Sequence, residues 1–163
     1  MSTLIVLIFS FGILWLLNTY ALRRFNFEEI GRASLALMLL FTGTAHFYKT
    51  DEMVQMMPEF LPNKLQWVYL TGVVEVAAAV GLLLTKTVQW TSIGLILFFL
   101  AILPANIIGS LKKVELGGME NGPVYLYFRI PLQFLFIGWT YYFGIYLREM
   151  PLKKKLHTNT SNS

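Results

Sequence analysis

Long apolar stretches alternate with short polar segments along this chain. Each stretch runs for about 18 to 25 residues, the length that a helix needs to cross a hydrocarbon core of about 30 Å. Lipid offers the backbone no hydrogen-bond partner, so only a helix satisfies such a stretch there. We therefore predict an all-α polytopic membrane protein, in which a four-helix transmembrane bundle follows an extra N-terminal transmembrane helix. The predicted spans are 3–22, 31–48, 67–85, 87–111 and 130–147.

The predicted domain organisation is simple. Residues 1–150 form one transmembrane domain, and residues 151–163 form a polar cytoplasmic tail. A cleaved signal peptide is the alternative for the first stretch. We favour a retained span, because no basic residue precedes it and Arg23 and Arg24 follow it.

Composition supports a membrane location. The chain has 163 residues, of which 56% are hydrophobic and 13% charged. A domain of this size cannot bury so much apolar surface in its own interior. A soluble enzyme, a nucleic-acid module and a disordered linker are therefore excluded. The chain has no cysteine, which rules out thiolate-held cofactors.

The distribution of basic residues predicts the orientation. With the N-terminus outside, eight of the thirteen Lys and Arg residues lie in inside segments. An excess of basic residues is typical of cytoplasmic segments. We predict an N-out, C-in protein of the bacterial cytoplasmic membrane.

The segment between the second and third spans, 49–66, carries its own pattern. An acidic first turn follows Thr50, as helix starts favour. Met53, Met56, Met57 and Phe60 then recur at helical spacing, and two prolines limit the helix. We expect a short helix that lies on the membrane surface or folds back as a lid; a packed connector is the alternative.

Five polar residues stand at the ends of spans or inside them, where lipid tolerates them poorly: His46, Glu75, Asn106, Arg129 and Gln133. Glu75 is the only carboxylate inside an apolar stretch. Such a group usually faces the bundle interior. The alternating topology places all five residues in the outer half of four neighbouring helices, beneath the methionine-rich segment. We therefore predict that Glu75 bonds with at least one of the other four.

Each polar residue also has a purely structural interpretation. Glu75 could be half of an ion pair, and His46 an interfacial anchor. Asn106 could satisfy backbone that Pro104 disturbs, and Arg129 could extend its cation toward the membrane surface. The coincidence of all of them in one region is what favours a functional site.

Five motifs resemble the DoxX family of small membrane proteins, in the same order over residues 33–147. They are Gly43-Thr-Ala-His46-Phe47, Met57-Pro58-Glu-Phe60-Leu61-Pro62, Tyr69-Leu-Thr-Gly72-Val-Val-Glu75, Leu103-Pro104-Ala105-Asn106-Ile107 and Arg129-Ile-Pro131-Leu132-Gln133. The resemblance implies a four-helix bundle with a cytoplasmic C-terminus. One branch of that family resembles a subunit of thiosulfate:quinone oxidoreductase, and a distant animal relative is similar to a receptor-assembly chaperone.

These observations predict an accessory membrane subunit of a redox or envelope-homeostasis system that binds a small lipidic or quinone-like ligand. A quinone is the candidate cofactor; we expect no catalytic residue and no metal site. The expected partners are the lipid bilayer, a membrane or redox protein and a second copy of the chain, but no nucleic acid. A membrane chaperone or scaffold is the alternative, and a transporter is a weaker one. The predicted ligand-binding residues are His46, Phe47, Met57, Trp67, Glu75, Asn106, Arg129 and Gln133.

Overall fold

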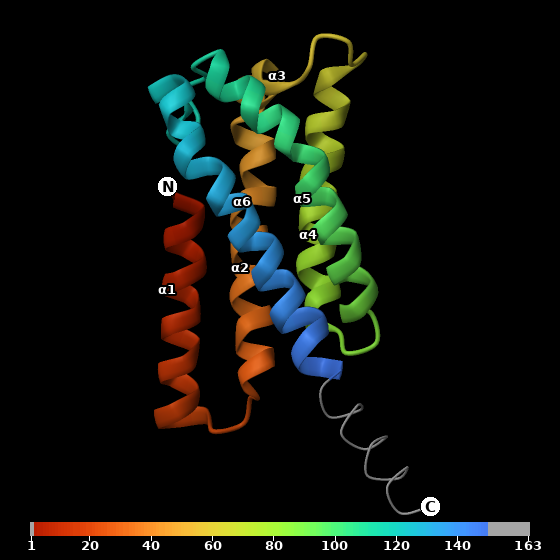
Figure 1. The fold of residues 1–163 in the computed structure, drawn as a ribbon. Coiled ribbons are helices and arrows are strands. Elements are labelled where there is room, and N and C mark those ends of the chain that lie inside the picture. The colour runs from red at the N-terminus through yellow and green to blue at the C-terminus, as the bar shows by residue number, and fades with distance from the viewer. Residues whose placement is uncertain (1, 150–163) are drawn as a thin grey trace, which may run out of the picture.

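The computed structural model describes residues 2–149, which are almost entirely helical and contain no strand (Figure 1). The tail predicted at 151–163 lies outside the described residues. The first half contains α1 (Ser2–Leu17), the π-helical η1 (Asn18–Leu22), α2 (Phe27–Tyr48) and α3 (Thr50–Met56). The second half contains α4 (Lys64–Leu83), α5 (Val88–Leu111), the 3-10 helix η2 (Met119–Tyr125), α6 (Leu126–Tyr141) and the π-helical η3 (Tyr142–Tyr146).

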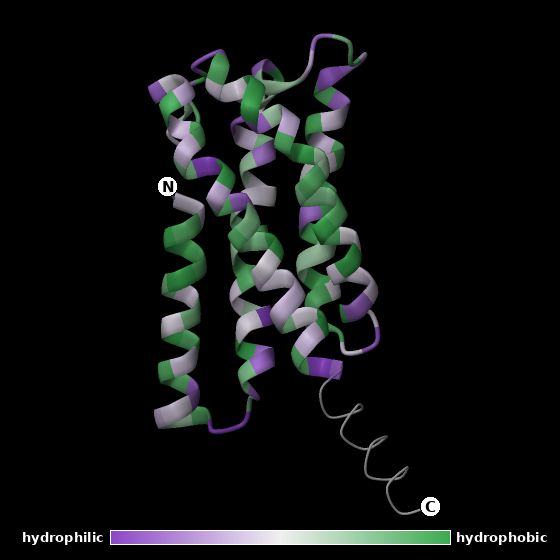
Figure 2. Cartoon of the chain, in the orientation of Figure 1, coloured by the Kyte–Doolittle hydropathy of each residue, from purple (hydrophilic) through white to green (hydrophobic). Residues whose placement is uncertain are grey.

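Five helical segments are long and apolar enough to cross a membrane. They are Ser2–Leu22, Phe27–Tyr48, Lys64–Leu83, Val88–Leu111 and Met119–Glu149. The prediction of an all-α polytopic membrane protein is thereby confirmed. Large side chains such as Phe9, Trp90, Leu97 and Phe134 remain exposed on the helix surfaces, where lipid would cover them. Figure 2 shows the apolar residues along the helices and the hydrophilic ones mostly toward the ends.

Some helix starts lie earlier than the sequence predicted. The second helix begins at Phe27 instead of 31, because Asn26 and Glu29 form a capping box in which the Asn26 N–H donates to Glu29 Oε2 at 2.9 Å. The fifth segment begins with η2, well before 130. Gly122 has a φ of 72° there, a conformation that favours glycine, so η2 bends into α6 through residues that the sequence pattern assigns to a loop.

The helices α2, α4, α5 and α6 form the bundle, and α1 lies beside α2 (Figure 1). The elements α3 and η2 lie together at one end of the bundle, which we call the α3 end. Leu7 of α1 is fully buried and joins the same core cluster as Leu39 and Phe136. Phe11 of α1 also packs edge-on against Trp139, with ring centroids 5.1 Å apart. The extra first helix is therefore part of the packed structure.

The helices α2 and α4 approach each other closely through two glycines. Gly43 and Gly72 face each other there. A Cβ on Gly72 would lie 2.7 Å from the Cβ of His46 and 3.1 Å from the Gly43 carbonyl oxygen. Two helices come this close only where small residues allow it.

We predict that Gly72→Ala destabilises the protein, although alanine favours helix by about 1 kcal/mol. Overpacking of this kind costs about 1–3 kcal/mol. Gly94→Ala is the matched control, since a Cβ at Gly94 in α5 meets nothing within 4 Å. Thermal unfolding in detergent should show a lower midpoint for Gly72→Ala and an equal or higher one for Gly94→Ala. Equal behaviour of the two variants would contradict the close packing.

Candidate ligand-binding pocket

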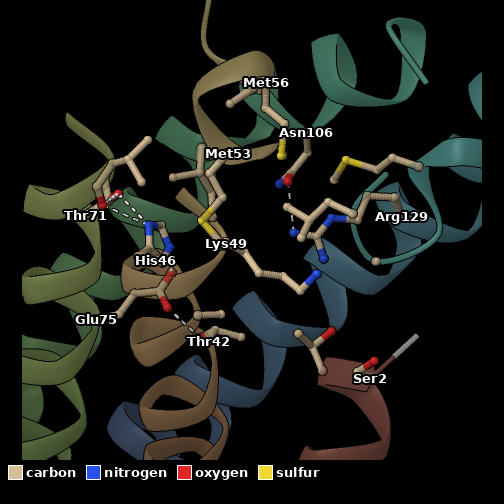
Figure 3. Close-up of a pocket in the computed structure, with 18 of the residues that line it drawn as sticks. Ser2, Thr42, His46, Lys49, Met53, Met56, Thr71, Glu75, Asn106 and Arg129 are labelled. Carbon is tan, nitrogen blue, oxygen red and sulfur yellow. Dashed lines mark hydrogen bonds and ion pairs between the residues drawn. The ribbon is translucent and has the colours of Figure 1, made fainter. Parts of the chain in front are cut away.

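A cavity of about 290 Å³ opens at the α3 end of the bundle. Figure 3 shows it from the side, with the methionines of α3 above and Ser2 of α1 below. Its walls come from all six α-helices and from residues near η2. Polar side chains gather on two opposite walls, one formed by α2 with α4 and the other by α5 with α6 (Figure 3).

The first wall is built around His46 and Glu75. Glu75 lies inside the bundle, with 6% of its surface exposed. Its Oε1 lies 3.5 Å from His46 Nε2, and its Oε2 accepts a hydrogen bond from the Thr42 hydroxyl. The predicted contact between Glu75 and another of the five polar residues is confirmed. The approach of α2 to α4 at Gly72 makes it possible, because the His46 Cβ sits directly over that glycine.

The other nitrogen of His46 also has polar neighbours. His46 Nδ1 lies 2.9 Å from the Val68 carbonyl oxygen, which can only accept a hydrogen bond, so a bond between them requires the proton on Nδ1. A neutral ring would then turn its Nε2 lone pair toward Glu75. That repulsion is avoided only when a further proton resides on Nε2 or on the Glu75 carboxyl group. We call His46 and Glu75 the proton pair, because a hydrogen bond between Nε2 and the carboxyl group requires a proton on one of them.

The second wall consists of Asn106 from α5 and Arg129 from α6. An amino group of Arg129 donates to Asn106 Oδ1 at 3.0 Å. Asn106 is 4% exposed. Its Nδ2 and the Arg129 Nε are both buried without a hydrogen-bond partner in the structure. We call these two residues the donor wall. Asn106 does not satisfy the backbone carbonyl that Pro104 frees, which is the alternative that the sequence left open, because its Nδ2, the only donor of its side chain, has no partner.

The third boundary of the pocket is the methionine-rich helix α3. Met53, Met56 and Met57 all line the cavity. Met56 is buried in a small cluster with Val114, Met119 and Tyr125. The methionine face of this segment thus folds onto the bundle, as both a lid and a packed connector would. Phe60 does not continue that face: α3 ends at Met56, and Phe60 is 84% exposed.

The structure brings five of the eight predicted ligand-binding residues to the pocket: His46, Met57, Glu75, Asn106 and Arg129. Phe47 instead stacks on Tyr69, with ring centroids 5.7 Å apart. Trp67 is exposed next to the inward-facing Val68. Gln133 is fully buried below the pocket, and its Nε2 donates to the Phe99 carbonyl oxygen at 2.6 Å. These three residues are not among those that line the cavity.

Several lining residues were missing from the predicted set. Thr71 is one of them; its hydroxyl lies 3.2 Å from His46 Nδ1. It stands four residues before Glu75 and so shares its helix face, a signal that could have found it. No sequence pattern indicated Ser2, because its position at the pocket depends on how α1 is aligned lengthwise with α2. Among residues 2–149, no group of three or more His, Asp or Glu side chains is arranged to hold a metal ion.

The fold and the pocket define a polytopic helical membrane protein with a polar cavity in one half of its bundle. The chain belongs to the family described as Domain of unknown function (DUF8561), whose model matches residues 35–144. No curated protein and no solved structure matches the chain. The resemblance to the DoxX family stays a prediction from the sequence.

We predict that Glu75→Ala destabilises the protein by about 1–3 kcal/mol, because it leaves buried polar groups of His46 and Thr42 without a partner. Glu75→Gln should recover much of that loss, since an amide can accept from Thr42 and donate to His46 Nε2. Thermal unfolding in detergent measures both variants. Glu59→Gln is the control; Glu59 is exposed and pairs with Lys112 at the surface, so no measurable change is expected. An equal loss for Gln and Ala would show that folding needs the carboxylate itself.

Proposed function

We propose that this protein binds a small lipidic or quinone-like molecule in the pocket and acts as a non-catalytic accessory subunit of a membrane system. The supporting observation is a mostly apolar cavity in which buried hydrogen-bond donors have no partner. Small-molecule sites combine a mostly apolar lining with a few convergent polar groups. Ionisable residues within transmembrane helices also mark functional sites more often than structural ones.

The size of the cavity limits how much of a ligand it can hold. A volume of about 290 Å³ is at the lower end of the range of ligand pockets, about 300–1,000 Å³. It suits a polar headgroup or a single ring with its first substituents. Methionines suit the cover of such a site, because their side chains are flexible and adapt to different shapes.

The redox or envelope role is a separate part of the proposal and rests on the resemblance to the DoxX family. It would make a quinone the ligand and a membrane redox protein the partner. The second candidate function is a membrane chaperone or scaffold with a purely structural polar cluster. It is favoured by one observation: His46, Glu75 and Thr42 already satisfy one another within the first wall.

Native mass spectrometry of the protein extracted from membranes distinguishes these two functions. A bound quinone or lipid that is lost when the pocket is altered supports the ligand-binding function. A stoichiometric protein partner on a chain that carries no small molecule supports the scaffold.

We predict that replacing Met53 and Met57 together with serine weakens retention of the copurified molecule at least several-fold. The thermal unfolding midpoint should fall by only a few degrees, because Met56, which carries the packing of α3, stays in place. Phe60→Ser is the control, since Phe60 lies in the same connection but outside the pocket. Lower stability with unchanged retention would assign α3 to packing alone.

We also propose that the α3 end faces the outside of a bacterial cytoplasmic membrane, with the N-terminus outside and the C-terminus inside. The chain has no native cysteine, so single cysteines report topology cleanly. In intact cells, an impermeant maleimide should label Asn121→Cys in η2 and spare Lys86→Cys between α4 and α5. Both positions are exposed. The reverse labelling pattern would overturn this orientation.

A further inference from the structure

The two polar walls of the pocket differ in whether their buried polar atoms have hydrogen-bond partners. On the first wall, the Glu75 oxygens and the two His46 ring nitrogens all face polar groups. On the donor wall, Asn106 and Arg129 keep two buried atoms that no described group satisfies (Figure 3). The pocket's buried polar atoms without a hydrogen-bond partner therefore lie on the donor wall.

Both unmet atoms are hydrogen-bond donors. A guanidinium group can only donate, so the atom of Asn106 that receives the bond from Arg129 must be the amide oxygen. The amide nitrogen is then the free atom, and it also donates. The Arg129 Nε–H is the second donor. Whatever completes this wall must consequently be an acceptor.

The wall also carries a positive charge that has no ion-pair partner. Among residues 2–149, no carboxylate forms an ion pair with Arg129 within 4.0 Å. Among the described residues that line the pocket, Glu75 is the only carboxylate, and it faces His46 and Thr42. The other cation of the pocket, Lys49, lies 3.5 Å from Glu52. A guanidinium withdrawn from water is costly unless an anion accompanies it.

We propose that Asn106 and Arg129 form an oxyanion subsite, which binds the carboxylate or phosphate of an acidic amphiphile. An anionic acceptor would complete the hydrogen bonds of both free donors and neutralise Arg129, and charge-assisted bonds of this kind are among the strongest in proteins. The apolar remainder of the ligand would contact Met53, Met57 and Ile102, which line the same cavity. This inference rests on the proposed function and narrows its ligand from a lipidic or quinone-like molecule to an acid.

The test compares three probes on the purified full-length protein in a neutral maltoside detergent. They are dodecyl phosphate, dodecanol and inorganic phosphate, and binding is measured by calorimetry and by the shift of the thermal unfolding midpoint. We expect dodecyl phosphate to bind at least about 10-fold more tightly than dodecanol, because only the phosphate forms charge-assisted bonds with the donor wall.

Two variants test whether the donor wall causes this preference. Arg129→Gln removes the charge and should abolish the preference. Asn106→Asp places a carboxylate beside Arg129 within the chain, so it should keep or raise the thermal midpoint and still abolish the preference. It thus remains informative if Arg129→Gln fails to fold. Lys112→Gln is the control; it removes one charge at the same end of the bundle, where Lys112 pairs with exposed Glu59, and should leave the preference intact.

The outcomes separate this inference from the proposed function. Equal binding of dodecanol and dodecyl phosphate would overturn the oxyanion subsite and leave the lipidic ligand standing. Equal binding of inorganic and dodecyl phosphate would support the subsite and contradict the lipidic ligand. A preference that survives in Asn106→Asp would overturn the subsite, and no binding of any probe would overturn both.

Discussion

The close approach of α2 to α4 at Gly43 and Gly72 is the contact on which the rest of the pocket depends. A side chain at Gly72 would meet the His46 Cβ at 2.7 Å, so glycine is what allows the histidine to reach across. From that position His46 contacts the Val68 carbonyl oxygen and the Glu75 carboxyl group. A packing constraint between two helices thus determines where the polar chemistry of the molecule lies.

Burial then gives the two polar walls different roles. The proton pair meets its own polar requirements, which explains how a carboxyl group can remain inside a membrane bundle without an external partner. The donor wall does not: Arg129 has a neutral amide as its neighbour, and donors on both residues remain free. Polar groups that satisfy one another stabilise the fold, whereas groups left without partners point to something that the chain itself does not supply.

The sequence was sufficient to predict the class of fold and the region of the site, because both follow from strong energetic rules. The length of the apolar stretches predicted the spans, and the free-energy cost of a carboxylate in lipid identified Glu75. Side-chain direction was harder to predict. Phe47 and Trp67 are next to inward-facing residues in the chain, but one position along a helix turns a side chain by about 100°. The early start of the fifth segment was missed because Gly122 and its neighbours resemble a loop, although short helical turns flank the kink at Gly122.

The family model matches only part of the chain that forms the pocket. Its model covers residues 35–144, which include His46, Glu75, Asn106 and Arg129 and therefore both polar walls. All of α1 lies outside that range, yet Ser2 and Thr3 line the pocket and Leu7 enters the core. The matched region thus contains the polar chemistry of the pocket, whereas α1 contributes one edge of it. A change at that edge would alter the shape of the cavity without removing either the proton pair or the donor wall.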